Sequence, residues 1–253
     1  EEIMDENVLC ARTLDDQEKV AAMIEKYGLV AIPIIDHENC LVGIVTVDDA
    51  MTVLQDEATE DISIMAGVTP NEDSYFGTSV FQHAKNRALW LMLLMLSATV
   101  SGEILAHYES AMAVMPILIT FIPMLMGTSG NCGSQSSTMV IRGIAVGEIE
   151  FKEFFKVVFK EIRIAILVGL MLAVVNGIRV YIMYDQDIML AIANGITMIA
   201  IVCMAKCIGC TLPLFAKKIG LDPALMAAPL ISTIMDTCTI LMYFAIITAF
   251  FKL

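Results

Sequence analysis

The sequence predicts an α-helical membrane bundle of five transmembrane helices, preceded by a small α/β domain. The 253 residues are 58% hydrophobic and only 17% charged, with a mean hydropathy of +0.76, whereas soluble domains are about 25% charged. The charges are also unevenly placed: residues 1–86 hold 18 acidic and 4 basic side chains, and residues 87–253 hold 10 and 11. We therefore expect an acidic soluble third and an apolar, nearly neutral membrane part. Neither part presents a basic stripe, which argues against a nucleic-acid partner.

Helix and strand signals alternate in residues 13–57. Thr13 or Asp15 can cap a first helix, and Gly28 can close it. Two β-rich runs follow at residues 30–35 and 41–46, and a second helix begins near Val47. This β-β-α order, together with the stretch Gly43-Ile44-Val45-Thr46-Val47-Asp48, resembles a CBS domain.

The CBS resemblance gives Asp48 two interpretations. In many CBS domains an aspartate at this position holds a nucleotide ribose, so the resemblance allows ATP as a ligand. The alternative is a helix-capping carboxylate with no nucleotide bound. CBS domains usually occur in pairs, so the single copy indicates either a truncated chain, which we favour, or a second half that comes from another chain.

Acidic side chains are concentrated at the end of this domain, and they are usually a solvated face. Placed opposite a second copy in a dimer, such carboxylates would repel one another unless a divalent cation neutralised them. We therefore expect a regulatory Mg²⁺ site formed by Asp48, Asp49, Asp56, Glu57, Glu60 and Asp61.

The membrane spans follow from length, because a bilayer core about 30 Å thick needs roughly 20 apolar residues per helix. Five segments qualify, at residues 88–107, 111–141, 162–184, 188–216 and 224–251. The basic residues of their connections all fall on the side of the N-terminus, which predicts a cytoplasmic N-terminus and an outside C-terminus in the plasma membrane. No signal peptide is visible in the acidic start of the sequence.

The second span contains Pro116, Pro123 and the polar, glycine-rich stretch 127–138. Unwound backbone is tolerated in a membrane only where it faces protein or a water-filled path. We expect such a break here, at a pore or binding site, because close packing would not explain Asn131, Gln135 and the nearby hydroxyl groups. The alternative is close helix packing through small residues.

The fifth span carries Asp236 near its middle, where an ionisable group marks an ion or proton pathway by default. Ser232 and Thr233 precede it by four and three residues and share its helix face, and Pro229 is expected to kink the helix. The alternative is a salt bridge between Asp236 and Lys206 of the fourth span.

These features together resemble the MgtE family of magnesium channels and transporters. The resemblance implies a homodimer, with Asp236 as the pore carboxylate for hydrated Mg²⁺ and Asn131 with neighbouring backbone lining the pore. It places Asp222 and Glu109 at the two pore mouths. It also implies a domain plan of a CBS domain at 1–72, a connecting helix at 73–87 and a permeation domain at 88–253.

Lys206 departs from the family pattern, which has an uncharged residue there. The stretches that carry the resemblance are Glu57-Ala58-Thr59-Glu60-Asp61, Gly127-Thr128-Ser129-Gly130-Asn131-Cys132-Gly133, Gly220-Leu221-Asp222-Pro223 and Pro229-Leu230-Ile231-Ser232-Thr233-Ile234-Met235-Asp236.

The resulting hypothesis is uptake of Mg²⁺ through a dimeric pore that cytosolic Mg²⁺ gates through the acidic domain. The alternative is a proton- or sodium-coupled exchanger of divalent cations with the same fold. We expect no enzyme, since no Ser–His pair shares a membrane depth and no Gly-x-Ser-x-Gly motif occurs. A membrane-anchored CBS sensor without transport would not explain the polar residues of the second and fifth spans.

Overall fold

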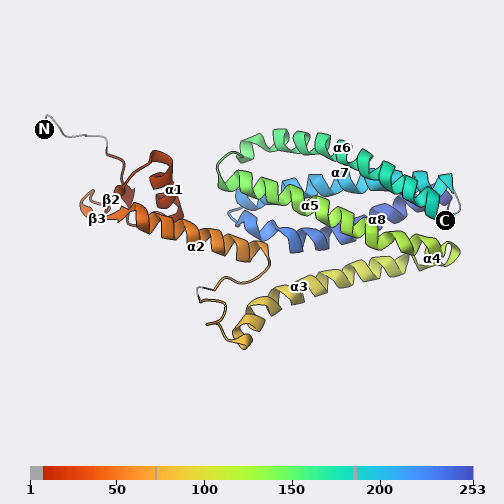
Figure 1. Cartoon of the computed structure of the whole chain (residues 1–253), viewed down its shortest axis with the longest axis horizontal. Coiled ribbons are helices and arrows are strands. Elements are labelled where there is room, and N and C mark those ends of the chain that lie inside the picture. The colour runs from red at the N-terminus through yellow and green to blue at the C-terminus, as the bar shows by residue number, and fades with distance from the viewer. Residues whose placement is uncertain (1–7, 72, 185–186, 253) are drawn as a thin grey trace. The chain divides into compact units, whose positions relative to one another are not determined.

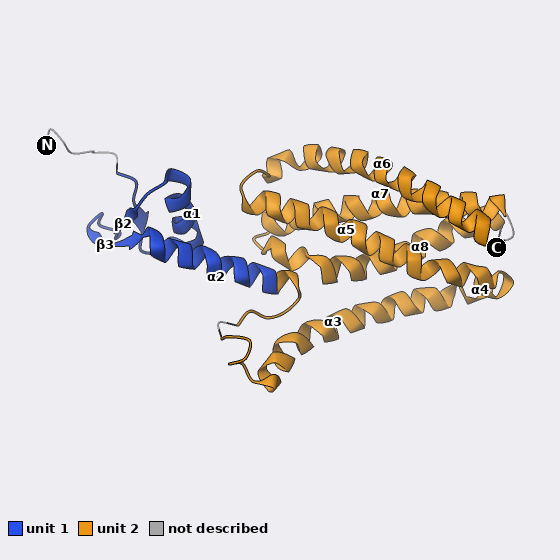
Figure 2. Cartoon of the chain, in the orientation of Figure 1, with its two compact units in different colours: residues 1–63 blue, residues 64–253 orange. Residues whose placement is uncertain are grey.

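A computed structural model describes residues 8–71, 73–184 and 187–252 of the chain. Two compact units divide it, residues 1–63 and residues 64–253 (Figure 2). Unit 1 is a small α/β domain, and unit 2 consists of helices (Figure 1). The fold class expected from the sequence is thereby confirmed.

Unit 1 contains a three-stranded sheet in the order β1-β2-β3, with β1 parallel to β2 and β2 antiparallel to β3. The helix α1 begins after Asp16, whose carboxylate accepts a hydrogen bond from the Glu18 amide, so neither Thr13 nor Asp15 is the cap. Gly28 closes α1 with φ of 62°, as expected. The bounds are β1 Ala11–Arg12, α1 Gln17–Tyr27, β2 Ala31–Ile35, β3 Leu41–Thr46 and α2 Val47–Met65.

The core of unit 1 is small, with Ile24 and Ile32 as its largest buried side chains. Three apolar side chains of β3 remain outside it: Leu41, Val42 and Ile44 are 68%, 60% and 62% exposed, whereas Val45 packs against the core. A single copy of this domain therefore leaves apolar surface uncovered.

Unit 2 is built around α7, which packs against α5, α6 and α8. Its core is closed by large side chains such as Phe121 and Tyr243, and the Tyr243 hydroxyl donates to the Leu118 carbonyl at 3.0 Å. The bounds are α3 Val80–His107, α4 Glu109–Val114, the 3-10 helix η1 Pro116–Phe121, α5 Ile122–Ala145, η2 Phe151–Glu153, α6 Phe154–Met183, α7 Ile188–Lys218, η3 Pro223–Met226 and α8 Ala228–Phe251.

Three helices of the described chain, α3, α7 and α8, are long and apolar enough to cross a membrane. The helices α5 and α6 have 24 and 30 residues, or about 36 and 45 Å at a rise of 1.5 Å per residue, so their length also suffices. The protein is a multi-pass membrane protein. The count of five spans stays a prediction.

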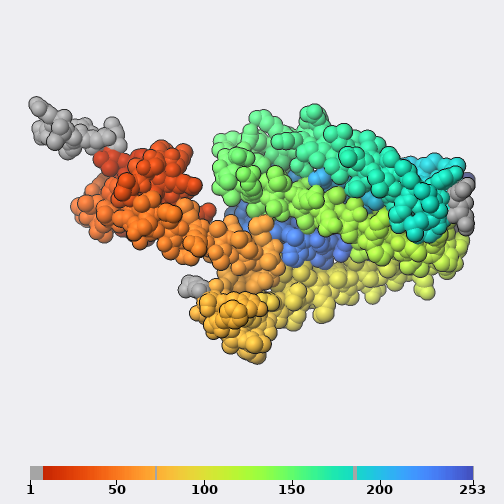
Figure 3. Space-filling view, viewed as in Figure 1, coloured from red at the N-terminus to blue at the C-terminus, as the bar shows by residue number. Residues whose placement is uncertain are grey.

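The helix α3 runs without interruption across the boundary expected at residues 87 and 88. It starts after Ser79, whose hydroxyl accepts from the Gln82 amide, and residues 73–79 before it form turns and bends. A separate connecting helix over 73–87 is therefore not formed. Within α3 only Ser101 is buried, and the helix packs along α8. In Figure 3, blue atoms of α8 reach the surface between α3 and α5.

Candidate functional site

Asp236 lies in the N-terminal half of α8 and is partly exposed in the protomer. Ser232, one helical turn earlier, is also partly exposed and packs against α5 at Gly130. A Cβ atom added to Gly130 would lie 3.4 Å from the Ser232 hydroxyl oxygen. The structure therefore brings Gly130 and its neighbour Asn131 close to the turn of α8 that leads to Asp236.

No basic side chain of the described chain forms an ion pair with Asp236. The expected alternative, a salt bridge from Lys206 to Asp236, is wrong because Lys206 pairs with a different carboxylate. Within the described residues, the Asp236 carboxylate therefore has no counter-ion where α8 packs against α5.

The helix α5 presents an exposed polar stripe from its middle to its last turn. Asn131, Gln135, Thr138 and Arg142 are all exposed, and their spacings of four, three and four residues place them along one side of the helix. Lipid cannot satisfy amide and hydroxyl groups. This side of α5 is therefore suited to face water or another polar protein surface.

The glycine-rich segment of α5 is a continuous helix, and the expected unwound break at 127–138 does not occur. Its glycines permit close packing instead. A Cβ on Gly133 would lie 2.8 Å from Ile231, and one on Gly209 of α7 would overlap the carbonyl oxygen of Gly133. The interruption lies earlier, where α4 gives way to the 3-10 helix that starts at Pro116. The alternative of packing through small residues is the correct one for these glycines.

Several hydroxyl groups near the site are engaged inside the protomer. Thr233 is buried and donates to the Pro229 carbonyl at 2.9 Å, so it faces the packed side of α8. Ser129 and Thr239 share a hydrogen bond of 2.6 Å between α5 and α8. Pro229 lies in the first turn of α8, which begins at Ala228, so it starts the helix and does not kink it.

The two residues expected at the pore mouths lie in different connections of unit 2, Glu109 at the start of α4 and Asp222 before η3. Asp222 is exposed before η3, and its carboxylate caps that helix by accepting from the Ala224 amide at 2.8 Å. Glu109 is exposed in the first turn of α4. Neither adds a ligand to the contact around Asp236. Among the described residues, no three acidic, histidine or cysteine side chains gather into a metal site.

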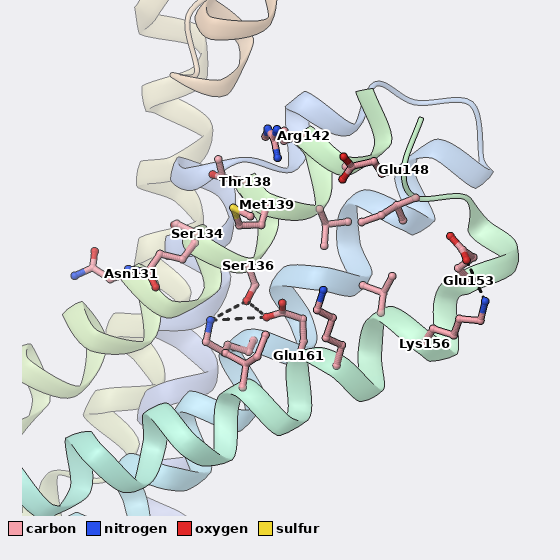
Figure 4. A pocket seen from close by; sticks show the side chains of 18 residues that line it. Asn131, Ser134, Ser136, Thr138, Met139, Arg142, Glu148, Glu153, Lys156 and Glu161 are labelled. Atoms are coloured by element: carbon pink, nitrogen blue, oxygen red, sulfur yellow. Dashed lines mark hydrogen bonds and ion pairs between the residues drawn. The ribbon is translucent and has the colours of Figure 1, made fainter. Parts of the chain in front are cut away.

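A second polar cluster, which the sequence did not reveal, lies on the wall of a cavity of about 940 Å³ between α5, α6 and α7 (Figure 4). Lys206 donates to the Ser136 hydroxyl at 3.2 Å and lies 3.8 Å from the Glu161 carboxylate. Ser136 in turn donates to Glu161 at 2.6 Å. Asn131 and Gln135 line the same cavity. Glu161 was overlooked because it falls in a charged stretch that reads as a connection between spans, whereas α6 begins seven residues earlier.

In unit 1 the expected regulatory residues all lie on α2, which carries six acidic side chains and no basic one. Glu57 accepts a hydrogen bond from Gln17 of α1 at 3.0 Å, and Asp49 accepts one from Thr46 at 2.7 Å. Asp48 is exposed in the first turn, and the Thr46 hydroxyl with the adjacent backbone amides lowers its pKa below the ordinary value. This position suits a capping carboxylate and also leaves Asp48 accessible to a ligand.

Comparisons with known proteins match both units. Residues 122–246 match the MgtE family model, described as a divalent cation transporter, and residues 1–56 match the CBS domain model. Three relatives are each named magnesium transporter MgtE. The protein of Thermus thermophilus is 36% identical over 97% of the chain and 54% of its own length. That of Bacillus subtilis is 36% identical over 99% and 55%, and that of Enterococcus faecalis is 32% identical over 99% and 54%. The chain spans about half the length of the curated relatives it matches.

Proposed function

Because the chain belongs to the MgtE family of divalent cation transporters, we propose that it supplies the membrane path and one cytosolic sensor domain of a Mg²⁺ transporter. The expectation that the chain is not an enzyme agrees with this family. The N-terminus lies in the cytoplasm and the protein resides in the plasma membrane, in keeping with the basic residues on that side.

The observation that carries the proposal is the unpaired carboxylate of Asp236 beside Ser232, where α8 meets α5. A charged group at such a depth is costly unless something compensates it. A passing cation supplies that compensation. Mg²⁺ keeps several of its waters and is usually held by one or two carboxylates. One carboxylate with hydroxyl and amide oxygens nearby suits a mostly hydrated Mg²⁺.

A homodimer follows from the surface that one protomer leaves uncovered. The polar stripe of α5 and the partly exposed Asp236 have no partner in lipid. A twofold axis beside α5 and α8 brings each of these surfaces against its own copy, as isologous interfaces do. The path then contains two Asp236 carboxylates that share one divalent cation.

The acidic helix α2 gives the path a control by cytosolic Mg²⁺. Asp48, Asp49, Asp56, Glu57, Glu60 and Asp61 form its acidic surface. Mg²⁺ bound between two such surfaces neutralises their repulsion and favours the closed state, and its loss favours the open state.

The test is Mg²⁺ uptake by liposomes that contain the purified protein and an enclosed Mg²⁺-sensitive dye. Asp236→Asn should lower uptake about tenfold or more, because loss of one charged ligand costs at least about 1.4 kcal/mol. Glu150→Gln is the matched control, since it removes an exposed carboxylate that pairs only with Lys152 at 3.2 Å. Equal uptake by the two variants would contradict the proposal.

The same liposomes separate a channel from the coupled exchanger. A channel passes Mg²⁺ under a membrane potential alone. An exchanger requires a proton or sodium gradient at any membrane potential. Mn²⁺, Co²⁺ and Ca²⁺ added outside then establish which ions compete for the path.

A further inference from the structure

The cavity between α5, α6 and α7 contains a buried cation with its oxygen ligands. The cation is the ammonium of Lys206, whose side chain is 7% exposed, and the anion is Glu161, at 13%. Three helices meet at this point, because Ser136 comes from α5, Glu161 from α6 and Lys206 from α7. Figure 4 shows Ser136 and Glu161 turned toward one another, with their interactions dashed.

Hydrogen bonding within the cluster is directional. The Ser136 hydroxyl uses its one proton on Glu161 and accepts from Lys206. Glu161 therefore receives one neutral hydrogen bond and one cationic neighbour. The ammonium occupies the position between a carboxylate and a hydroxyl oxygen that a bound metal cation would occupy.

The cavity is large enough to admit an ion with water. A water molecule takes about 30 Å³ of liquid volume, so the cavity of about 940 Å³ holds a hydrated cation with room to spare. Asn131 and Gln135, whose amide oxygens are of the type that Mg²⁺ and Mn²⁺ accept, line the same space. A site with one carboxylate is sufficient for Mg²⁺ or Mn²⁺, which complete their coordination with water.

We propose that Ser136 and Glu161 form a second divalent-cation site in the wall of this cavity, which Lys206 keeps filled with its own ammonium. The chemical class of ligand rests on the proposed function, while the existence of the site does not. While Lys206 is in place, the Lys206–Glu161 pair has no net charge, and an ion is attracted to the carboxylate of Asp236 instead. Without Lys206, an ion that moves to or from Asp236 also binds at Ser136 and Glu161.

The decisive measurement is the number of Mn²⁺ ions bound per chain, counted by the loss of free-ion electron paramagnetic resonance signal in the purified full chain. Lys206→Met should bind one Mn²⁺ more than the wild type. Lys206→Met with Glu161→Gln should return to the wild-type number. Lys160→Met is the matched control, because Lys160 lines the same cavity but is exposed, and it should leave the number unchanged.

An unchanged number in Lys206→Met would overturn the proposal, and so would an extra ion that persists when Glu161 is replaced. Should Lys206→Met not yield folded protein, Lys206→Gln removes the same charge while keeping a donor for Ser136, with the same expected count.

Uptake separates this proposal from the proposed function. Lys206→Met should reach half-maximal Mg²⁺ uptake at a lower concentration and with a lower maximal rate. A chain that binds the extra Mn²⁺ but transports no Mg²⁺ would contradict the transport function alone. A chain that transports Mg²⁺ with an unchanged Mn²⁺ count would contradict the second site alone.

Discussion

The Lys206 ammonium and the Glu161 carboxylate lie 3.8 Å apart in the interior of the helical unit. This pair joins α6 to α7, and Ser136 joins α5 to both. Because Lys206 pairs with Glu161, it does not place an unpaired cation beside Asp236.

Breaking this pair on one side should destabilise the protein. Glu161→Gln leaves an ammonium without its counter-ion, which costs about 3 kcal/mol, the lower end of the usual range, because water enters the adjacent cavity. Replacing both partners, as Lys206→Met and Glu161→Gln, should restore most of the loss. Melting temperatures in detergent measure both effects, and a double variant no more stable than Glu161→Gln would contradict the pairing.

The close approach of α5 and α7 should not tolerate a methyl group at Gly209. A Cβ atom there would overlap the backbone oxygen of Gly133, which cannot rotate away. Gly209→Ala should therefore cost about 1–3 kcal/mol and lower the melting temperature. Gly102→Ala on α3 is the control, since nothing lies within 4 Å of its added Cβ. A loss of stability as large in the control would refute the packing argument.

Neutralising α2 should weaken the control by Mg²⁺. The variant Glu57→Gln, Glu60→Gln, Asp61→Asn removes three carboxylates and keeps a hydrogen-bond acceptor for Gln17. The dependence of uptake on cytosolic-side Mg²⁺ should become severalfold weaker, because the repulsion that Mg²⁺ has to neutralise before closure is no longer present. Glu25→Gln with Glu38→Gln, elsewhere in unit 1, should leave it unchanged. Full sensitivity in the triple variant would place the sensor outside α2.

The proposed axis beside α5 should be detectable by disulfide trapping. In a background without the native cysteines, Gln135→Cys on the exposed stripe should form a disulfide with its own copy under mild oxidation. Leu167→Cys, which is exposed on α6, should remain monomeric on denaturing gels. Crosslinking of Leu167→Cys in preference to Gln135→Cys would move the interface to α6.

Local patterns predicted unit 1 well because its turns and strands are set by neighbouring residues. The Gly28 cap and both long strands follow from sequence alone. The short strand β1 has only two residues and is defined by its pairing with β2. It therefore leaves no pattern of its own.

The site was predictable in its types of residue and less so in its geometry. The sequence identified Asp236 and Asn131 by polarity in an apolar segment. It could not distinguish a glycine that unwinds a helix from one that lets a neighbour approach, since Gly133 is explained by a residue on α7. The partner of Lys206 was missed for the same reason, because a contact between distant helices is not a local property.

The composition of α5 has a consequence for how the protein is made. This helix buries Ser129, Gly130 and Gly133 where it packs on α7 and α8, and both of these helices leave the ribosome after it. An inserting α5 therefore emerges without the neighbours that satisfy its hydroxyl groups. The stable insertion of α5 in the bilayer therefore depends on α8, which is synthesised later and whose Thr239 completes the hydrogen bond with Ser129. Truncation before α8 during synthesis should leave α5 exposed to membrane quality control, even though α5 itself is complete.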